Sequence, residues 1–305
     1  MEAGHEAGAK VRRGSAGYDH AMKLHRPGAE IWTPDGRPPA EALARTTHMG
    51  IGAHQDDVEI LGQRGILDCF DREDRWFTAV VVTDGAGSAR GGPYAHYDDE
   101  RMRAVRKLEQ KKAGMVGDYS AVVLLDYTSR EVKTPPATPV VEDLAALLQA
   151  ARPQVLYTHN LADKHDTHIG TLMRVIEACR RLPAADRPPR LLGGEAWRDL
   201  DWMCDPDKVA VPLSDREALS SALLGVFDSQ ITGGKRYDLA TSGRFRAHAT
   251  YHQSHHLDAT NLLAFLMDLT PLVEDPSLDP VAYAKGFIDR FQAEVVGRVK
   301  RITGR

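Results

Sequence analysis

Cysteine is scarce in this chain: Cys69, Cys179 and Cys204 are the three among 305 residues. They lie far apart and form no Cys-x-x-Cys pair, so neither a disulfide framework nor a thiolate zinc site is indicated. Long apolar runs are also missing, because no stretch of eighteen apolar residues occurs and the first thirty residues lack the apolar segment of a signal peptide. These absences predict a soluble, cytoplasmic protein with no membrane insertion.

The chain also has no large excess of charge of one sign. The chain has 39 Lys and Arg against 43 Asp and Glu, which gives a formal net charge of -4. Proteins that bind nucleic acid or an anionic membrane surface usually carry a concentrated basic face. We therefore expect no nucleic-acid partner. With 42% hydrophobic residues the chain can bury a large core, and we predict one domain over residues 1–305.

The most informative stretch is residues 47–60. A short apolar run that contains two glycines predicts a strand, and it ends in His54, Asp56 and Asp57 just before a segment with helical spacing. A Rossmann nucleotide site would carry Gly-x-Gly-x-x-Gly in this first strand-to-helix turn. Two carboxylates there would instead repel a pyrophosphate and attract a divalent cation.

Strands and helices alternate through the middle of the chain. Apolar runs predict further buried strands over 77–83, 121–125 and 154–158, and helical spacing covers 98–116 and 140–151. The alternation predicts an α/β fold, a Rossmann-like doubly wound and mostly parallel sheet flanked by helices, with C-terminal helices.

The two ends of the chain differ from this middle part. Residues 1–46 lack periodicity and predict a partly disordered leader, whereas residues 46–235 form the motif-bearing α/β core. Residues 236–305 predict a helical C-terminal part. Its last helix, over 282–302, has an apolar stripe that we expect to pack on the body.

A second polar group follows the strand predicted at 154–158. His165 and His168 stand three apart at the start of a helix, so they share one face. Ligands of open parallel sheets bind outside the carboxyl ends of the strands, where these histidines would meet the carboxylates of the first turn. Two imidazoles and one carboxylate with an open position suit a catalytic zinc. Aspartates that merely cap a helix, and histidines on a solvated surface, are the alternatives.

Two segments resemble the defining motifs of the PIG-L (LmbE-like) family of metal-dependent N-acetylglucosaminyl deacetylases. They are Ala53-His54-Gln55-Asp56-Asp57 and His165-Asp166-Thr167-His168. The family pattern is Ala-His-Pro-Asp-Asp followed later by His-x-x-His. Gln55 therefore replaces the usual proline, which changes the stiffness of the turn but removes no ligand.

The resemblance implies a role for each motif residue. His54, Asp57 and His168 would bind one Zn²⁺ per chain, with other divalent metals left open; Asp56 would be the general base, and His165 would stabilise the oxyanion. The implied enzyme is a zinc-dependent N-deacetylase. It removes an N-acetyl group from a small-molecule N-acetylglucosaminide and releases acetate and a free amine.

Weaker matches lie between and after these motifs. Arg106 and Glu109 resemble the family's Arg-x-x-Glu helix, and Asp126 resembles an aspartate after the third strand; in relatives such residues hold sugar hydroxyls. Ser229-Gln230 resembles a late Ser-Gln pair. The resemblance thus implies that Arg106 and Asp126 bind the substrate, although a surface charge and a strand-end turn residue are the plain alternatives.

Two other functions stay open from the sequence. One is a non-catalytic sugar-binding α/β domain, which would need neither Asp56 nor His165; the other is a 2-His-1-carboxylate iron enzyme, a type built on antiparallel barrels rather than alternating strands and helices. Trp197, Trp202 and the group His248, His252, His255 and His256 have no assigned role, and a homo-oligomer is left open.

Overall fold

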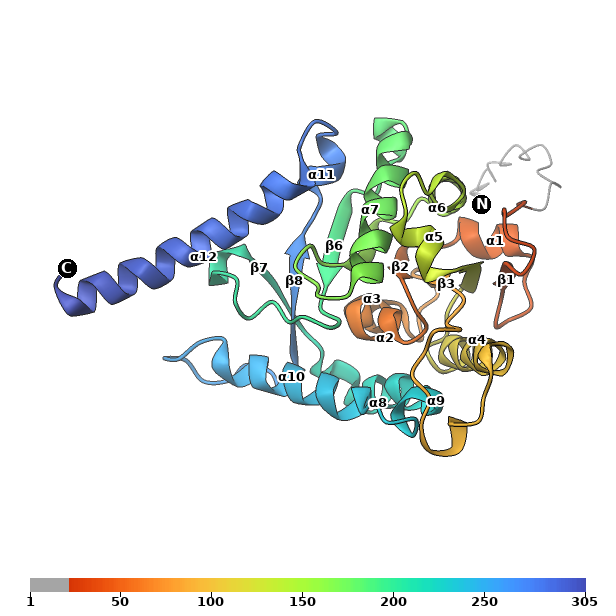
Figure 1. Ribbon diagram of the computed structural model, residues 1–305, viewed down its shortest axis with the longest axis horizontal. Coiled ribbons are helices and arrows are strands. Elements are labelled where there is room, and N and C mark those ends of the chain that lie inside the picture. Colours follow the sequence, from red (N-terminus) through yellow and green to blue (C-terminus); the bar gives the residue numbers. More distant parts are fainter. Residues whose placement is uncertain (1–21) are drawn as a thin grey trace, which may run out of the picture.

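The computed structural model describes residues 22–305, in which eight strands form one mixed sheet (Figure 1). The strand order is β1-β4-β3-β2-β5-β6-β8-β7. Neighbours from β4 to β6 run parallel, whereas β1, β8 and β7 pair antiparallel at the two edges. The strands are β1 (Glu30–Trp32), β2 (His48–Gly52), β3 (Phe77–Thr83), β4 (Ala121–Tyr127), β5 (Val155–His159), β6 (Arg190–Gly194), β7 (Lys208–Pro212) and β8 (Leu263–Asp268).

Helices cover both faces of this sheet. Side chains from α1, α5, α6 and α7 pack into the core on one face, and side chains from α2 and α3 pack into the core on the other. The helices are α1 (Pro39–Ala44), α2 (Asp57–Leu61), α3 (Gln63–Cys69), α4 (Asp99–Val116), α5 (Ser129–Lys133), α6 (Thr138–Ala151), α7 (Asp166–Arg181), α8 (Glu217–Gly225), α9 (Asp228–Ile231), α10 (Tyr237–Tyr251), α11 (Pro271–Glu274) and α12 (Pro280–Thr303).

Strand β3 shows why the central strands have continuous apolar sequences. Its alternate residues belong to different cores, Val80 and Val82 to one and Ala79 and Val81 to the other, and all four are fully buried. A strand that is covered on both faces has no position for an exposed polar side chain. The predicted doubly wound, mostly parallel sheet with C-terminal helices is therefore confirmed.

The strand order reverses direction between β2 and β5. From β2 the chain moves outward through β3 to β4, and it then crosses back to place β5 on the other side of β2. The loops after β2 and β5 consequently diverge to opposite faces of the sheet and leave a crevice at the carboxyl ends of these strands, where open α/β sheets bind ligands.

Two predictions for the chain ends need correction. Residues 30–44 of the expected leader are folded, since β1 pairs with β4 at the edge of the sheet and Leu43 of α1 enters the core. The part of that prediction that concerns residues 1–21 lies outside the described residues. The C-terminal part is not wholly helical either, because β8 lies between β6 and β7 in the sheet.

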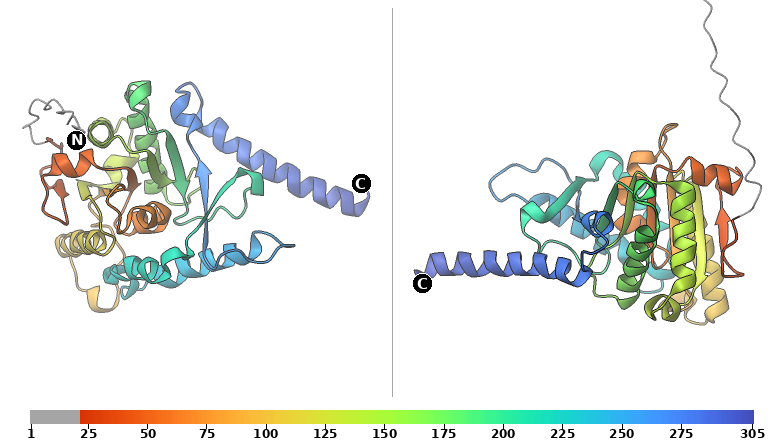
Figure 2. Two further views of the ribbon diagram at one scale, coloured as in Figure 1. Left: turned by 180° about the vertical axis from the view of Figure 1, so that it is seen from behind. Right: turned by 90° about the horizontal axis from the view of Figure 1, so that it is seen from above.

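The last helix does not pack along the body as expected. Helix α12 runs outward from the sheet edge, and its C-terminal half stands clear of the other elements in three views (Figures 1 and 2). Phe287 is its single buried residue. No helix within residues 22–305 is both long enough and apolar enough to cross a membrane.

Candidate active site

The turn after β2 is tightly folded. Asp56 adopts a left-handed conformation with φ of 86°, and Asp57 begins α2 directly after it. Gly52 permits this sharp return, because a Cβ atom at that position would lie 2.9 Å from the Cβ of Asp57. The carboxylate of Asp57 then accepts a hydrogen bond of 2.7 Å from the backbone N–H of His54. The turn thereby directs His54 and Asp57 toward one point.

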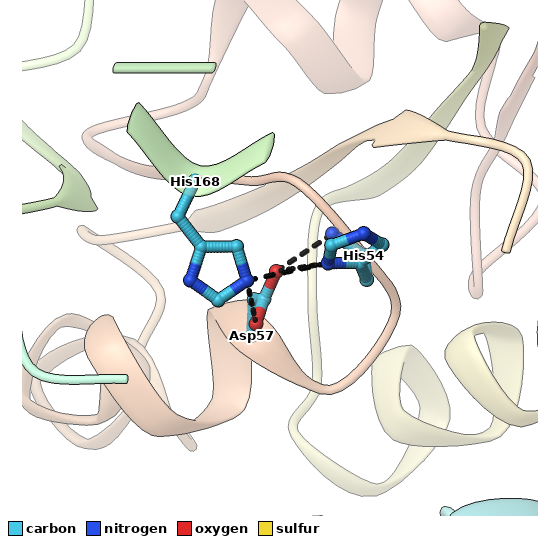
Figure 3. A group of neighbouring side chains, drawn as sticks. All are labelled: His54, Asp57 and His168. Atoms are coloured by element: carbon cyan, nitrogen blue, oxygen red, sulfur yellow. Dashed lines mark hydrogen bonds and ion pairs between the residues drawn. The ribbon is translucent and has the colours of Figure 1, made fainter. Parts of the chain in front are cut away.

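His168, in the first turn of α7, completes a group of three with these two residues (Figure 3). His54 Nδ1 lies 3.3 Å from Asp57 Oδ2 and 3.3 Å from His168 Nε2. His168 Nε2 lies 3.4 Å from Asp57 Oδ1. A tetrahedral zinc site with metal–ligand distances of about 2.0–2.2 Å separates its ligands by roughly 3.3–3.6 Å. The donor set and its spacing therefore fit such an ion.

Two residues that the sequence analysis did not assign support His168. Asp163 Oδ2 lies 3.2 Å from His168 Nδ1, on the far side of the ring from Asp57. His159, at the end of β5, stacks on His168 with ring centroids 3.9 Å apart, and its Nε2 accepts the backbone N–H of Ala53 at 2.9 Å. A carboxylate behind a histidine ligand fixes the ring orientation and raises its basicity. Only this general rule could have directed attention to Asp163, because no motif in the sequence marks it.

The charges of this group favour metal binding. Burial alone would raise the pKa of Asp57, but His168 and His159 hold it well below its usual range. Burial has the opposite effect on an imidazole: it lowers the pKa of His159 to about 4, so this ring is neutral at pH 7. The site thus contains an ionised carboxylate that faces imidazole nitrogens from two strand ends.

Asp56 is not one of these three residues, and its carboxylate pairs with Arg106 of α4. Arg106 is 2% exposed; its Nη1 donates to Asp56 Oδ2 at 3.1 Å, and its Nη2 donates to the carbonyl of Gln55 at 2.5 Å. The side chain of Gln110 accepts the backbone N–H of Asp56 at 3.4 Å. Burial raises the pKa of Asp56 to about 7, although Arg106 opposes this shift.

These contacts do not match the sugar-binding role expected of Arg106 and Asp126. The guanidinium of Arg106 is buried against the backbone and carboxylate of the β2–α2 turn, so we describe it as a support for Asp56. Asp126 lies near the C-terminal end of β4, two strands from β2, where its carboxylate pairs with Lys107 at 3.1 Å and packs against Gly28.

His165 lies beside the group of His54, Asp57 and His168. Its ring centroid is 5.1 Å from that of His54 and 4.6 Å from that of His168. Nδ1 of His165 accepts the backbone N–H of Thr167 at 3.3 Å, which caps α7 and leaves the ring proton on Nε2. Burial, together with His168 and His54, lowers the pKa of His165, so this residue is a neutral donor.

A pocket with a volume of about 270 Å³ lies at Asp56 and Asp57; His54, His165 and His168 are not among the residues that line it. Its walls come from two segments far along the chain, which bring Trp197, Lys235, Tyr237 and Arg244 to the two aspartates. Trp197, which had no role assigned from the sequence, is 37% exposed, and its ring lies 5.9 Å from that of His165. No motif in the sequence marked these walls.

The two remaining motifs, Arg-x-x-Glu and Ser-Gln, connect helices α4 and α9. Glu109 of α4 accepts the backbone N–H of Ser229 at 2.7 Å and its hydroxyl at 2.6 Å. Both residues are buried, so the Arg-x-x-Glu and Ser-Gln segments meet and fix α9 against α4. This contact holds the chain that leads into Lys235 and Tyr237.

Comparison with known proteins shows that this fold is shared with solved structures. No protein of curated function matches the sequence. Among solved structures, N,N'-diacetylchitobiose deacetylase from Pyrococcus horikoshii is similar with a TM-score of 0.57 and 16% identity, over 75% of this chain and 86% of that one. The conserved protein TT1542 from Thermus thermophilus gives a TM-score of 0.53 and 18% identity, over 77% of this chain and 99% of that one.

This chain is also similar to a solved structure that is described as a hydratase and not as a deacetylase. The 4-carboxy-2-hydroxymuconate hydratase GalB from Pseudomonas putida has a TM-score of 0.53 and 13% identity, over 73% of this chain and 96% of that one. Likeness at such identities shows a shared fold and leaves the reaction to the residues of the site. Those residues fall within residues 49–179, the segment that matches a family model described as PIG-L: GlcNAc-PI de-N-acetylase.

Proposed function

We propose that this protein is a zinc-dependent N-deacetylase that removes the acetyl group from a glucosamine-type sugar or conjugate. The observation that carries the proposal is the triangle of His54, Asp57 and His168 with sides of 3.3–3.4 Å, beside a buried carboxylate that is not part of it. A divalent cation held there would supply Lewis-acid activation of the amide carbonyl and of water. Zinc suits the nitrogen and oxygen donors.

Asp56 is the residue of the pocket that can move a proton. Its carboxylate would take a proton from the attacking water and deliver it to the leaving amine nitrogen, as a general base and then a general acid. Such a group works best when its pKa lies near the working pH. Burial brings the pKa of Asp56 to about 7, and Arg106 keeps the carboxylate in one orientation.

His165 would stabilise the negative charge that develops on the carbonyl oxygen. Because its Nδ1 accepts the N–H of Thr167, the proton lies on Nε2 and can be donated without a charge on the ring. A preorganised donor of this kind contributes about 10²–10³-fold to kcat. This role needs a neutral imidazole, which agrees with the lowered pKa of His165.

The pocket walls suit a small sugar-containing ligand. Trp197 and Tyr237 offer ring faces beside the reacting group, and Lys235 lies over the Trp197 ring at 4.9 Å. Most of this lining lies beyond residue 179, so the substrate would be chosen by residues outside the family motifs. A small-molecule N-acetylglucosaminide in the cytoplasm is the substrate that we propose.

The test is acetate release by purified, zinc-loaded protein from a panel of lipid-linked, thiol-precursor, chitobiose and antibiotic glucosaminides. We expect turnover of at least one member, and loss of this turnover in Asp56→Asn. Metal content by mass spectrometry accompanies the assay. Iron with no acetate release would favour an oxygenase, absence of metal with sugar binding would favour a non-catalytic domain, and hydration of an enoic acid would favour a hydratase.

A further inference from the structure

Helix α12 carries an apolar row whose five side chains are 38–80% exposed within residues 22–305. Phe287 is buried, Arg290 donates to Asp207 at 2.7 Å, and Phe291 meets the edge of Trp202. From Ile288 to the end of the chain every residue is exposed. The helix is thus anchored at its middle, and its second half projects away from the body (Figure 2).

The row has an internal symmetry. It consists of Ile288, Phe291, Val295, Val299 and Ile302, which are separated by three, four, four and three residues. At 100° per residue these side chains share one face, about 21 Å long at a rise of 1.5 Å per residue. The sequence of intervals is the same from either end, with Val295 at the centre. A self-complementary face of this kind is what a two-fold interface requires, since the same surface meets itself.

The projecting end is also a poor helix by itself. Val295, Val296, Val299 and Ile302 are β-branched, and Gly297 lies between them; all five have low helix propensity. Isolated helices of this length are marginal in water, so most helices in proteins depend on packing of their apolar face. We therefore expect the C-terminal half of α12 to be stabilised by packing of this apolar row against another molecule.

We propose that α12 pairs in antiparallel fashion with α12 of a second copy of this chain, about a two-fold axis at Val295. Ile288 then faces the partner's Ile302, Phe291 faces the partner's Val299, and the two Val295 side chains meet. Each of these side chains carries on the order of 100 Å² of apolar surface. The ten side chains of the two copies together approach the roughly 1,000 Å² that a specific interface needs.

The charges favour this orientation over a parallel one. The last turns of α12 are basic, with Arg298, Lys300 and Arg301, whereas Asp289 lies near its middle. Antiparallel pairing separates the two basic ends and brings each toward the partner's Asp289, while parallel pairing would bring like charges together. An anionic membrane surface is the competing occupant, because a basic amphipathic helix also binds anionic lipid.

The experiment uses the full chain and measures its mass in solution by light scattering and sedimentation. We expect a dimer for the wild type, and dissociation into monomers for Val295→Asp, which places two charges at the axis. Ala293→Asp is the matched control, since it adds the same charge to the opposite exposed face of α12, and it should stay dimeric. Circular dichroism shows whether each variant is folded.

A cross-linking variant keeps the proposal testable if Val295→Asp does not fold. Val295→Cys should form an intermolecular disulfide on mild oxidation, because the axis brings the two side chains together, whereas Ala293→Cys should not. A monomeric wild type, a dimer that survives Val295→Asp, or cross-linking as efficient at position 293 as at 295 would overturn the proposal. Binding of the monomer to phosphatidylserine vesicles would assign the row to lipid instead.

Discussion

Arg106 and Asp56 form a buried ion pair, with Nη1 3.1 Å from Oδ2, between α4 and the turn after β2. Two opposed effects act on this carboxylate. Burial raises the pKa of Asp56 to about 7, and the guanidinium opposes the increase. Arg106 also fills hydrogen-bond acceptors of Gln55, so it holds the whole left-handed turn. These contacts make Arg106 a structural support for Asp56 and its turn.

The first prediction is that Arg106→Lys lowers kcat about 10-fold or more while zinc content and KM change little. Lysine keeps a charge but cannot bridge Asp56 and Gln55 together, and one to two charge-assisted hydrogen bonds are worth about 1.5–3 kcal/mol each. Loss of the hydrogen bond from the guanidinium should also raise the pKa of Asp56, so the rise of kcat with pH should move to higher pH. Steady-state kinetics across pH provide the measurement. Arg101→Gln, on the exposed side of α4, is the control; a raised KM with unchanged kcat would return Arg106 to sugar binding.

The second prediction separates the two adjacent aspartates. Asp56→Asn should keep zinc and lose about 10²–10⁴ in kcat, the span of general acid–base catalysis. Asp57→Asn should lose zinc, because it removes an ionised ligand from the triangle with His54 and His168. Zinc per chain and kcat are measured for both variants, with folding checked by circular dichroism. A metal-free Asp56→Asn beside a metallated Asp57→Asn would reverse the assignment.

The third prediction concerns Asp163, which lies 3.2 Å behind His168. Asp163→Asn should weaken zinc affinity about 10–100-fold, the usual effect of losing the carboxylate behind a histidine ligand. Competition with a fluorescent chelator measures the affinity without reference to activity. Asp166→Asn is the matched control, because Asp166 is exposed in the first turn of α7. Equal affinities of the two variants would mean that Asp163 does not act through the metal.

The parts of the molecule that were predictable are those encoded locally. The apolar run before His54 and the one before His159 each give a strand with polar residues at its end, so the sheet and the approach of these two polar segments followed from the sequence. The family resemblance was needed to single out His54, Asp57 and His168, which the structure brings together. The family resemblance supplied Asp56 and His165 as separate from the ligands. The placement of the two segments needs little more than strand periodicity and the rule for the ends of parallel strands.

The parts that were missed depend on distant contacts. Whether Arg106 faces a sugar or a buried turn is decided by how α4 packs on β2, which a single sequence does not encode locally. Trp197 and Tyr237 reach the pocket only because the segments beyond residue 179 fold back over it. The stripe of α12 was recognised, but the same periodicity is expected whether it packs on the body or on another chain.

Away from the pocket, Glu195 and His248 form a second buried pair whose charge state matters for stability. Glu195 accepts the backbone N–H of Leu200 at 2.7 Å and of Phe265 at 3.3 Å, and it lies 3.5 Å from His248 Nδ1. Burial raises the pKa of Glu195 to about 8 and lowers the pKa of His248 to about 4. At pH 6 both side chains are therefore neutral, and the short distance reflects a neutral contact rather than an ion pair.

The last prediction follows from the proton on Glu195. The unfolded chain releases this proton near pH 4.5 and the folded chain near pH 8, so between these values the folded state binds more protons. The stabilisation is complete below pH 4.5 and declines as the pH rises toward 8, by at most about 1.4 kcal/mol per pH unit. Glu195→Gln carries no titrating proton, so its free energy of unfolding should decline less than that of the wild type over the same range. Urea unfolding at pH 5, 6.5 and 8 measures the difference, with Glu274→Gln at an exposed position as the control. Parallel pH profiles for the wild type and Glu195→Gln would mean that Glu195 is ionised in the folded protein, with His248 as its charged partner.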